Sequence, residues 1–266
     1  MLFPVVLTSA ALAADLALVN ATVLPVSGPP LVPGTVLITD GRIEAVGQGL
    51  AVPEGTPTLD LTGKTVTPGI VDVHSHMGVY SWPGGSSHSD GNEMTDPFTA
   101  DVWAGDSVRV HDPAFRRARA GGVTTVQILP GSANLVGGQS AVLKLRDSRT
   151  LEGLLFEDAP RGIKMACGEN PKRVYGEQEK GPATRMGNLA RMRAKLQEAK
   201  DYQTAREGRD PVARDAELEV LLAVLDGEIR VHLHCYRHDD IEGMVRLMDE
   251  HGVRMASIQH ALEAYK

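Results

Sequence analysis

Short apolar runs alternate with stretches of helical periodicity from Pro68 onward, and this alternation constrains the fold more than any other feature. Strands separated by helices pair in parallel. The pattern therefore predicts an α/β protein with about six strands, either in an open doubly wound sheet or in part of a barrel. We expect strands at residues 69–74, 122–129, 141–145, 162–167, 228–234 and 252–260, helices at 111–120, 184–206, 211–226 and 239–251, and a loop at 131–138.

The residues before Pro68 follow a different pattern. Apolar and polar residues alternate in short runs around Asp40-Gly41 and Gly63-Lys64. Asp-Gly between two such runs is a strong hairpin signal. We therefore expect a small β-rich module over residues 15–67, followed by a second domain over 68–266.

The first residues, 1–14, are apolar and then small. Ala11-Leu12-Ala13 fits the cleavage site of a signal peptide, although no positive charge precedes the apolar run. We expect export to the periplasm or the cell exterior. The alternative is an ordinary hydrophobic strand in a cytoplasmic protein.

The composition is that of a globular protein, with 42% hydrophobic residues and a formal net charge of −7. This acidic balance argues against a nucleic-acid surface. No later stretch reaches the ~18 consecutive apolar residues of a membrane span. The two cysteines, Cys167 and Cys235, are too few for a disulfide framework, and two buried thiols are the favoured interpretation.

Histidines gather at the ends of the predicted strands. His74 and His76 end the first run, His234 the fifth and His260 the sixth. The carboxyl ends of parallel strands meet at one mouth, so we expect these imidazoles to converge there. Imidazoles and carboxylates suit Zn²⁺, Mn²⁺ or Fe²⁺. Asp72 shares a strand face with His74 and is expected to orient a ligand histidine, or else to accept a structural hydrogen bond.

Several stretches together resemble the amidohydrolase superfamily, in particular its imidazolonepropionase-like and exported dipeptidase-like branch. They are TPGIVDVHSHMG, GVTTVQILPGSANLVGGQ, GIKMACGENPKRVYG, HLHCYRHDD and QHALEAYK. The resemblance runs from about residue 16 to the last residue. It implies a (β/α)8 TIM-type barrel behind a small β-sandwich module, and one or two divalent metal ions, with Zn²⁺ the first expectation.

The same resemblance implies roles for single residues. The four strand-end histidines match the metal ligands of the family, and Lys164 matches a lysine that many members carry as a carbamate. That role requires reaction with CO₂, because a free ammonium group cannot ligate a metal. Glu169, close behind the same predicted strand, is the alternative ligand. His232 lies one step deeper than the ligand histidine of its strand and is expected to face the barrel interior.

The sequence departs from the family after its sixth predicted strand. The family pattern needs an aspartate after strand eight, as proton shuttle and metal ligand, and the sequence given reaches Lys266 before that point. A complete barrel takes ~250 residues. We therefore expect a barrel that is incomplete after strand six, from a truncated gene product or a partial reading frame.

The resemblance implies hydrolysis of a non-aromatic carbon–nitrogen bond by metal-activated water, in a small-molecule cyclic amide or dipeptide. The shortened chain is expected to be inactive by itself, and the alternative is an inactive metal-binding remnant that needs a completing segment. A homo-oligomer would be ordinary for a barrel enzyme. Candidates for contacts with the substrate, on loops near the strand ends, are Lys172, Arg173, Tyr175 and Arg237.

Overall fold

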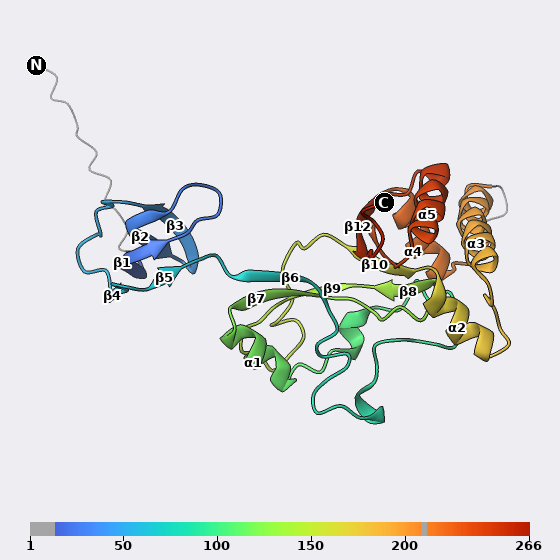
Figure 1. Cartoon of the computed structure of the whole chain (residues 1–266), viewed down its shortest axis with the longest axis horizontal. Helices are drawn as coiled ribbons and strands as arrows, with labels where there is room; N and C mark the ends of the chain where they lie inside the picture. The colour runs from blue at the N-terminus through green and yellow to red at the C-terminus, as the bar shows by residue number, and fades with distance from the viewer. Residues whose placement is uncertain (1–13, 209–211) are drawn as a thin grey trace, which may run out of the picture. The chain divides into compact units, whose positions relative to one another are not determined.

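The computed structural model describes residues 14–208 and 212–266, which divide into two compact units (Figure 1). One unit ends at Gly69 and the other is Ile70–Lys266. The expected signal peptide, apart from Ala14, and Pro211, the expected start of a helix, lie outside the described residues. Within the described ranges, no helix is long and apolar enough to cross a membrane.

The unit that ends at Gly69 is a β-sheet, as its alternating sequence predicts. The turn between its second and third strands consists of Asp40 and Gly41, both with positive φ, which is the conformation of a tight hairpin turn. The strand order is β3-β2-β1-β4, and β5 also pairs with β1. The strands are β1 (Leu16–Val23), β2 (Leu31–Thr39), β3 (Arg42–Gly47), β4 (Thr58–Asp60) and β5 (Thr65–Val66).

The second unit contains two sheets. One has the order β6-β7-β9, and the other β12-β11-β10-β8. β6 runs parallel to β7, and β10, β11 and β12 run parallel to one another. No sheet closes on itself among the described residues, so the barrel is partial. The strands are β6 (Ile70–Ser75), β7 (Val123–Ile128), β8 (Val136–Gln139), β9 (Ala141–Lys144), β10 (Gly162–Ala166), β11 (Arg230–Cys235) and β12 (Met255–His260).

Two strands differ from the expectation of a wholly parallel arrangement. β9 is antiparallel to β7, and β8, which falls partly in the predicted loop at 131–138, is antiparallel to β10. The connection between β7 and β9 explains the antiparallel direction of β9. No helix lies between β7 and β9 to return the chain to the starting end, so the chain folds straight back.

Helices follow most of the parallel strands. α1 (Pro113–Ala120), α3 (Arg185–Arg206) and α5 (His238–His251) confirm the predicted helices, and α4 (Ala216–Leu225) begins later than expected. α2 (Glu169–Glu177) shows that Lys172, Arg173 and Tyr175, expected on a loop after the fourth predicted strand, lie on a helix instead. Its Pro171 lies in the first turn, where a missing N–H breaks no intrahelical bond. Two short 3₁₀ helices, η1 (Ser86–His88) and η2 (Ala104–Ser107), lie between β6 and α1.

The main core lies between the sheet of β10, β11 and β12 and the helices α3, α4 and α5 (Figure 1). Fully buried side chains such as Leu196, Leu221 and Leu233 fill it. Cys167 and Cys235 belong to this core and form a disulfide with their Cα atoms 5.4 Å apart, so the interpretation as free thiols was wrong. The parallel register explains the bond, because Ala166 lies opposite His234 and the next residues on the two strands are the cysteines.

β6 is less buried than its sequence predicts. It lies at the edge of its sheet, and the side chains of Ile70, Val71 and Val73 are 55%, 58% and 59% exposed. The apolar run therefore fails to predict burial here, because an edge strand has neighbours on one side only.

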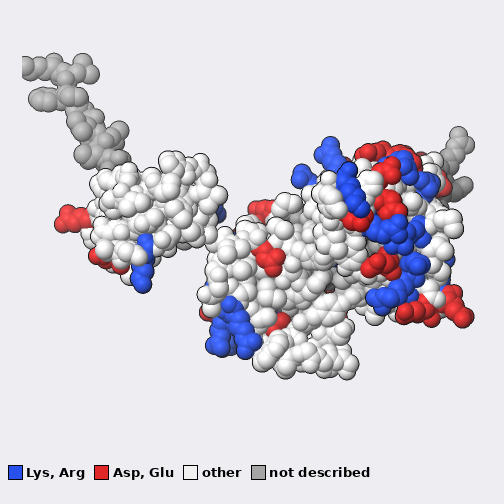
Figure 2. Space-filling model, in the orientation of Figure 1, with Lys and Arg blue, Asp and Glu red and all other residues white. Residues whose placement is uncertain are grey.

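The helical surface carries mixed charge. Figure 2 shows acidic and basic side chains interspersed over this part of the molecule. On α3, Arg193 pairs with Glu250 at 3.1 Å and Lys195 pairs with Glu217. α3 is therefore a helix with a solvated face, on which these basic residues have acidic partners.

Candidate functional site

The histidines expected to converge do so at the carboxyl ends of β6, β11 and β12. The ring centroids of His74 and His76 are 5.0 Å apart, as are those of His74 and His260, and the centroids of His260 and His234 are 4.5 Å apart. His74 thus connects the first sheet to the second. We call these four residues the histidine cluster.

Hydrogen bonds fix which nitrogens of the first pair face each other. His74 Nδ1 donates to Gln259 Oε1 at 2.8 Å, and His76 Nδ1 donates to the Leu129 carbonyl oxygen at 2.7 Å. In a neutral ring the proton on Nδ1 leaves a lone pair on Nε2. The two Nε2 atoms, 3.3 Å apart, therefore face each other as acceptors without a donor between them.

That separation suits a shared metal ion. Two nitrogen ligands at ~2.0–2.1 Å from a tetrahedral Zn²⁺ lie about 3.3–3.4 Å from each other. Across the described chain, no three His, Cys, Asp or Glu side chains already converge on one point. The His74–His76 pair thus has ligand spacing, and the rings of His260 and His234 lie next to it in the histidine cluster.

His234 offers a further nitrogen. Its Nε2 lies 3.1 Å from Asn170 Nδ2, whereas its Nδ1 is buried without a hydrogen-bond partner among the described residues. A buried polar atom of this kind is costly unless something binds it. Burial lowers the pKa of His234 to about 3 and that of His76 to about 4, so both rings are neutral at pH 7, as ligation requires.

Lys164 lies fully buried in β10, close enough to the histidine cluster to lower the pKa of its members. Its Nζ donates to the Pro130 carbonyl oxygen at 3.0 Å. Desolvation lowers the pKa of the amine to about 8. The structure thus places Lys164 beside the cluster, whereas Glu169 is exposed on the first turn of α2, next to Lys172 and Arg173.

His260 reaches the cluster through an unusual backbone. It lies opposite Cys235, whose side chain packs in the core on the other side of the sheet, so simple alternation would direct His260 away from His234. Instead His260 has a left-handed φ of 65° and its ring lies against that of His234. The departure from strand geometry at His260 thus turns its imidazole toward the other histidines of the cluster.

Asp72 takes the second of its two expected roles. Its carboxylate accepts from the backbone N–H of His74 at 3.1 Å. The imidazole of His74 is held by Gln259 instead.

The four residues expected to contact the substrate differ in exposure and in partners. Lys172 and Arg173 are exposed on α2, and Arg237 pairs with Asp239 at the start of α5. Tyr175 is fully buried, and its hydroxyl lies 2.6 Å from the Asp96 carbonyl oxygen, so the structure gives it a packing role rather than the predicted substrate contact.

Other residues near the cluster were missing from the sequence prediction. The ring of Tyr236 lies 4.6 Å from that of His234, and the ring of Tyr80 lies 5.8 Å from that of His76. Gln259 and Asn170 bond to imidazole nitrogens. Gln259 bonds from β12 to His74 on β6, a contact between two sheets, and the other three come from loops or from a helix that was not predicted.

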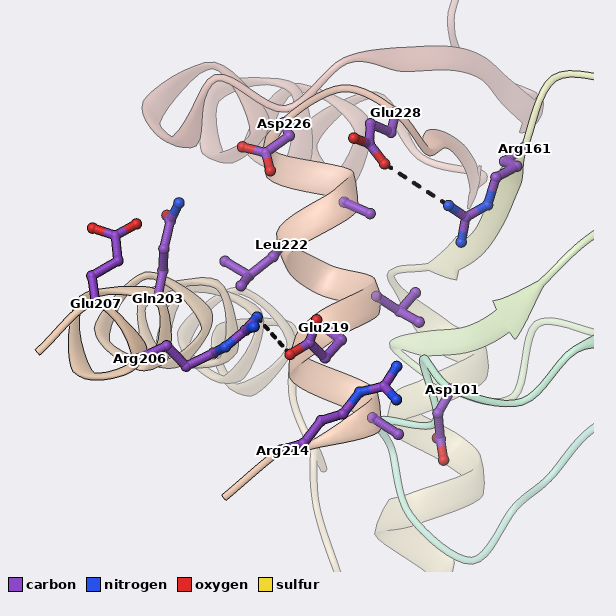
Figure 3. Close-up of a pocket in the computed structure, with 13 residues that line it drawn as sticks. Asp101, Arg161, Gln203, Arg206, Glu207, Arg214, Glu219, Leu222, Asp226 and Glu228 are labelled. Carbon is purple, nitrogen blue, oxygen red and sulfur yellow. Dashed lines mark ion pairs between the residues drawn. The ribbon is translucent and has the colours of Figure 1, made fainter. Parts of the chain in front are cut away.

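A cavity of about 640 Å³ lies elsewhere in the same unit (Figure 3). Its wall includes the Arg206–Glu219 and Arg161–Glu228 ion pairs. Arg161 and Glu228 precede β10 and β11, so the cavity is at the opposite strand ends from the histidine cluster. It is distinct from the candidate site.

The chain is similar in sequence and structure to known hydrolases. An amidohydrolase of known structure from Thermotoga maritima is 43% identical, and the match covers 94% of this chain and 65% of that chain with a TM-score of 0.87. Amidohydrolase tasK of Hapsidospora irregularis is 35% identical over 257 residues, 87% of this chain and 26% of that protein. A dihydroorotase of Citrifermentans bemidjiense is 32% identical over 120 residues, 45% of this chain and 23% of that protein.

The chain thus spans less than two thirds of each of these relatives. No family model matches it. The agreement in sequence and in fold nevertheless covers nearly all of its residues. On these grounds the chain belongs to the amidohydrolase superfamily.

Proposed function

We propose that this chain is part of a metal-dependent hydrolase that cleaves a non-aromatic carbon–nitrogen bond in a cyclic amide or a dipeptide. The observation that carries the proposal is the pair of Nε2 lone pairs on His74 and His76, which face each other 3.3 Å apart. The names of the relatives, amidohydrolase and dihydroorotase, support the type of bond.

The histidine cluster would hold the ion, for which Zn²⁺ is the first choice and Mn²⁺ or Fe²⁺ the alternatives. A bound divalent ion supplies a Lewis acid that activates water near pH 7. Lys164 would join as a carbamate, since its neutral Nζ adds to CO₂ and releases a proton to leave a carboxylate-type ligand. Its complete burial beside the cluster favours it over the exposed Glu169.

The other residues of the site position the ligands and flank the substrate. Gln259 and the Leu129 carbonyl hold His74 and His76 with Nε2 free. Tyr236 and Tyr80 lie against His234 and His76, where a substrate at the cluster would contact them. Export is part of the proposal. The Cys167–Cys235 disulfide supports it, because disulfides persist in oxidising compartments.

The test compares the full native protein with a His76→Ala variant and a His111→Ala control, in which an exposed histidine outside the cluster is replaced. Each is stripped of metal, reloaded with Zn²⁺ or Mn²⁺, and assayed for metal content and for hydrolysis of dipeptides and of dihydroorotate. We expect both properties in the wild type and in the control, and neither in His76→Ala. Metal-independent hydrolysis, or zinc retained by His76→Ala, would refute the proposal.

A further inference from the structure

A series of hydrogen-bonded side chains connects the two sheets of the second unit below the histidine cluster. Gln127 on β7 contacts His232 on β11 at 2.9 Å, and His232 contacts Ser257 on β12 at 2.8 Å. Ser257 contacts Gln259 at 2.6 Å, and Gln259 contacts His74 on β6 at 2.8 Å. The series therefore ends on a candidate metal ligand.

The donor in each of these bonds follows from the chemistry of the groups. The amide Nε2 of Gln127 can only donate, so Nε2 of His232 accepts and the ring carries its proton on Nδ1. That Nδ1 donates to Ser257 Oγ, and Gln259 Nε2 donates to the same oxygen. Ser257 is thus a double acceptor on which two donors converge.

The bond from Gln259 Nε2 to Ser257 Oγ gives the orientation of the Gln259 amide. With Nε2 directed at Ser257, Oε1 is directed at His74, and an amide oxygen accepts only from a protonated ring nitrogen. His74 therefore carries its proton on Nδ1. A flipped amide would present Nε2 to His74 Nδ1, moving the ring proton to Nε2, where it would point at His76 and block the nitrogen that faces the ion.

We propose that Gln259 is a positioning residue that selects the metal-competent tautomer of His74, with Ser257 and His232 holding its amide in the required orientation. This inference rests on the proposed metal centre. It gives His232 a function that its place in the barrel interior alone does not. It also gives a role to both polar atoms of Gln259, a residue that is only 8% exposed. Partners of this kind raise the affinity of metal sites by orienting the ligands.

The test uses three variants of the full protein labelled with ¹⁵N-histidine. Gln259→Leu removes both polar atoms. Gln259→Glu keeps an acceptor for His74, because Ser257 can turn its own hydroxyl proton toward the second carboxylate oxygen. Gln139→Leu replaces a glutamine of the same sheet that contacts Arg161 and lies outside the series, and it serves as the control.

Two properties are measured. Long-range ¹H–¹⁵N spectra of the metal-free proteins report the tautomer of His74, assigned by comparison with His74→Gln. Competition with a chromophoric chelator gives the Zn²⁺ affinity. We expect Gln259→Leu to lose the pure Nδ1–H signature and 10–100-fold in affinity. Gln259→Glu and the control should match the wild type. Ser257→Ala, which frees the amide to turn, provides the same test if Gln259→Leu does not fold.

The inference is overturned if Gln259→Leu keeps the Nδ1–H tautomer and wild-type affinity, or if Gln259→Glu loses as much affinity as Gln259→Leu. Failure of the proposed function looks different. A wild-type protein that binds no Zn²⁺ would refute the metal centre, while the spectra of the metal-free protein would still test the control of the tautomer by Gln259.

Discussion

Lys164 is a cation buried among imidazoles, with a backbone carbonyl as its hydrogen-bond partner. Its pKa is about 8 in the folded chain, below the ordinary value of 10.5. Below pH 8 both the folded and the unfolded amine are charged, so the folded state carries the full cost of desolvation. As pH rises from 8 toward 10.5 the folded amine loses its proton first, and the cost fades.

Replacing Lys164 by Met should therefore stabilise the metal-free protein in CO₂-free buffer. We expect the free energy of unfolding at pH 7 to rise by about 2 kcal/mol, because one pKa unit corresponds to ~1.4 kcal/mol and loss of the bond to Pro130 offsets part of the gain. The gain should shrink at pH 10. Urea unfolding measures it, with exposed Lys172→Met as the control. A less stable Lys164→Met variant would show that the buried charge is compensated by contacts of the amine.

For single residues, the sequence predicts the candidate metal ligands better than it predicts the side chains that form hydrogen bonds with them. His74, His76 and His234 follow from strand ends and from alternation along the strand. His260 follows from its strand end but not from alternation, because its left-handed φ reverses the expected side. Gln259 was missed, since a hydrogen bond from β12 to His74 on β6 depends on how two sheets face each other.

Among the secondary-structure elements, α1 is tied to the loop before it by one side chain. Asp112, at the N-terminus of α1, is buried and accepts from Ala114 N at 2.9 Å, Gly78 N at 2.9 Å and Trp82 N at 3.2 Å. It thus caps the helix and also fixes the residues that follow β6. A cap with one bond contributes about 1 kcal/mol.

Asp112→Ala should cost more than an ordinary cap. We expect a loss of about 3 kcal/mol in the free energy of unfolding, because buried N–H groups lose a charged acceptor. Thr184→Ala, which removes a single bond to Gly187 N at the start of α3, is the matched control with a loss of about 1 kcal/mol. Denaturant titration of both variants measures the two losses in free energy of unfolding. Equal losses would mean that water replaces the Asp112 carboxylate as acceptor for the loop N–H groups.

Helices and strands could be predicted from the sequence where the pattern of their own residues determines them. Apolar runs located most strands, and α1, α3 and α5 matched their periodicity. The direction of β9 was not predictable from its own residues, because it depends on whether a helix intervenes. α2 was missed because proline and glycine at residues 168–176 favour a loop, whereas a proline in the first helical turn disrupts nothing.

For the whole molecule, the neutral histidines predict a loss of stability in mild acid. Burial lowers the pKa of His76 and His232 to about 4 and that of His234 to about 3. Between pH 6.5 and these values the unfolded chain binds protons that the folded chain does not, so the free energy of unfolding falls as the pH falls.

The contribution of one histidine can be isolated. His232→Gln should reduce the slope of unfolding free energy against pH by roughly 1 kcal/mol per pH unit between pH 6 and 5, since one fewer proton is taken up on unfolding. Urea titrations of the metal-free wild type and variant at half-unit intervals measure this. An unchanged slope would mean that His232 titrates alike in both states.

Metal binding should stabilise the same global fold. A ligand that binds only the folded state adds about 2.7 kcal/mol when its free concentration is 100 times its dissociation constant. We expect Zn²⁺ to raise the midpoint of thermal unfolding and a chelator to reverse the shift. His76→Ala should show neither effect, whereas a shift retained in that variant would place the stabilising ion elsewhere.

At His260, the stability of the backbone and the presence of an imidazole in the histidine cluster favour different residues. Both His260 and Ala261 have positive φ, at 65° and 44°, a conformation that costs a residue with a side chain roughly 1–2 kcal/mol. Glycine at position 260 would relieve that cost and remove an imidazole from the cluster. Selection for thermostability alone should thus drift away from histidine here, and a library sorted only for heat resistance would be enriched in proteins that have lost a ligand.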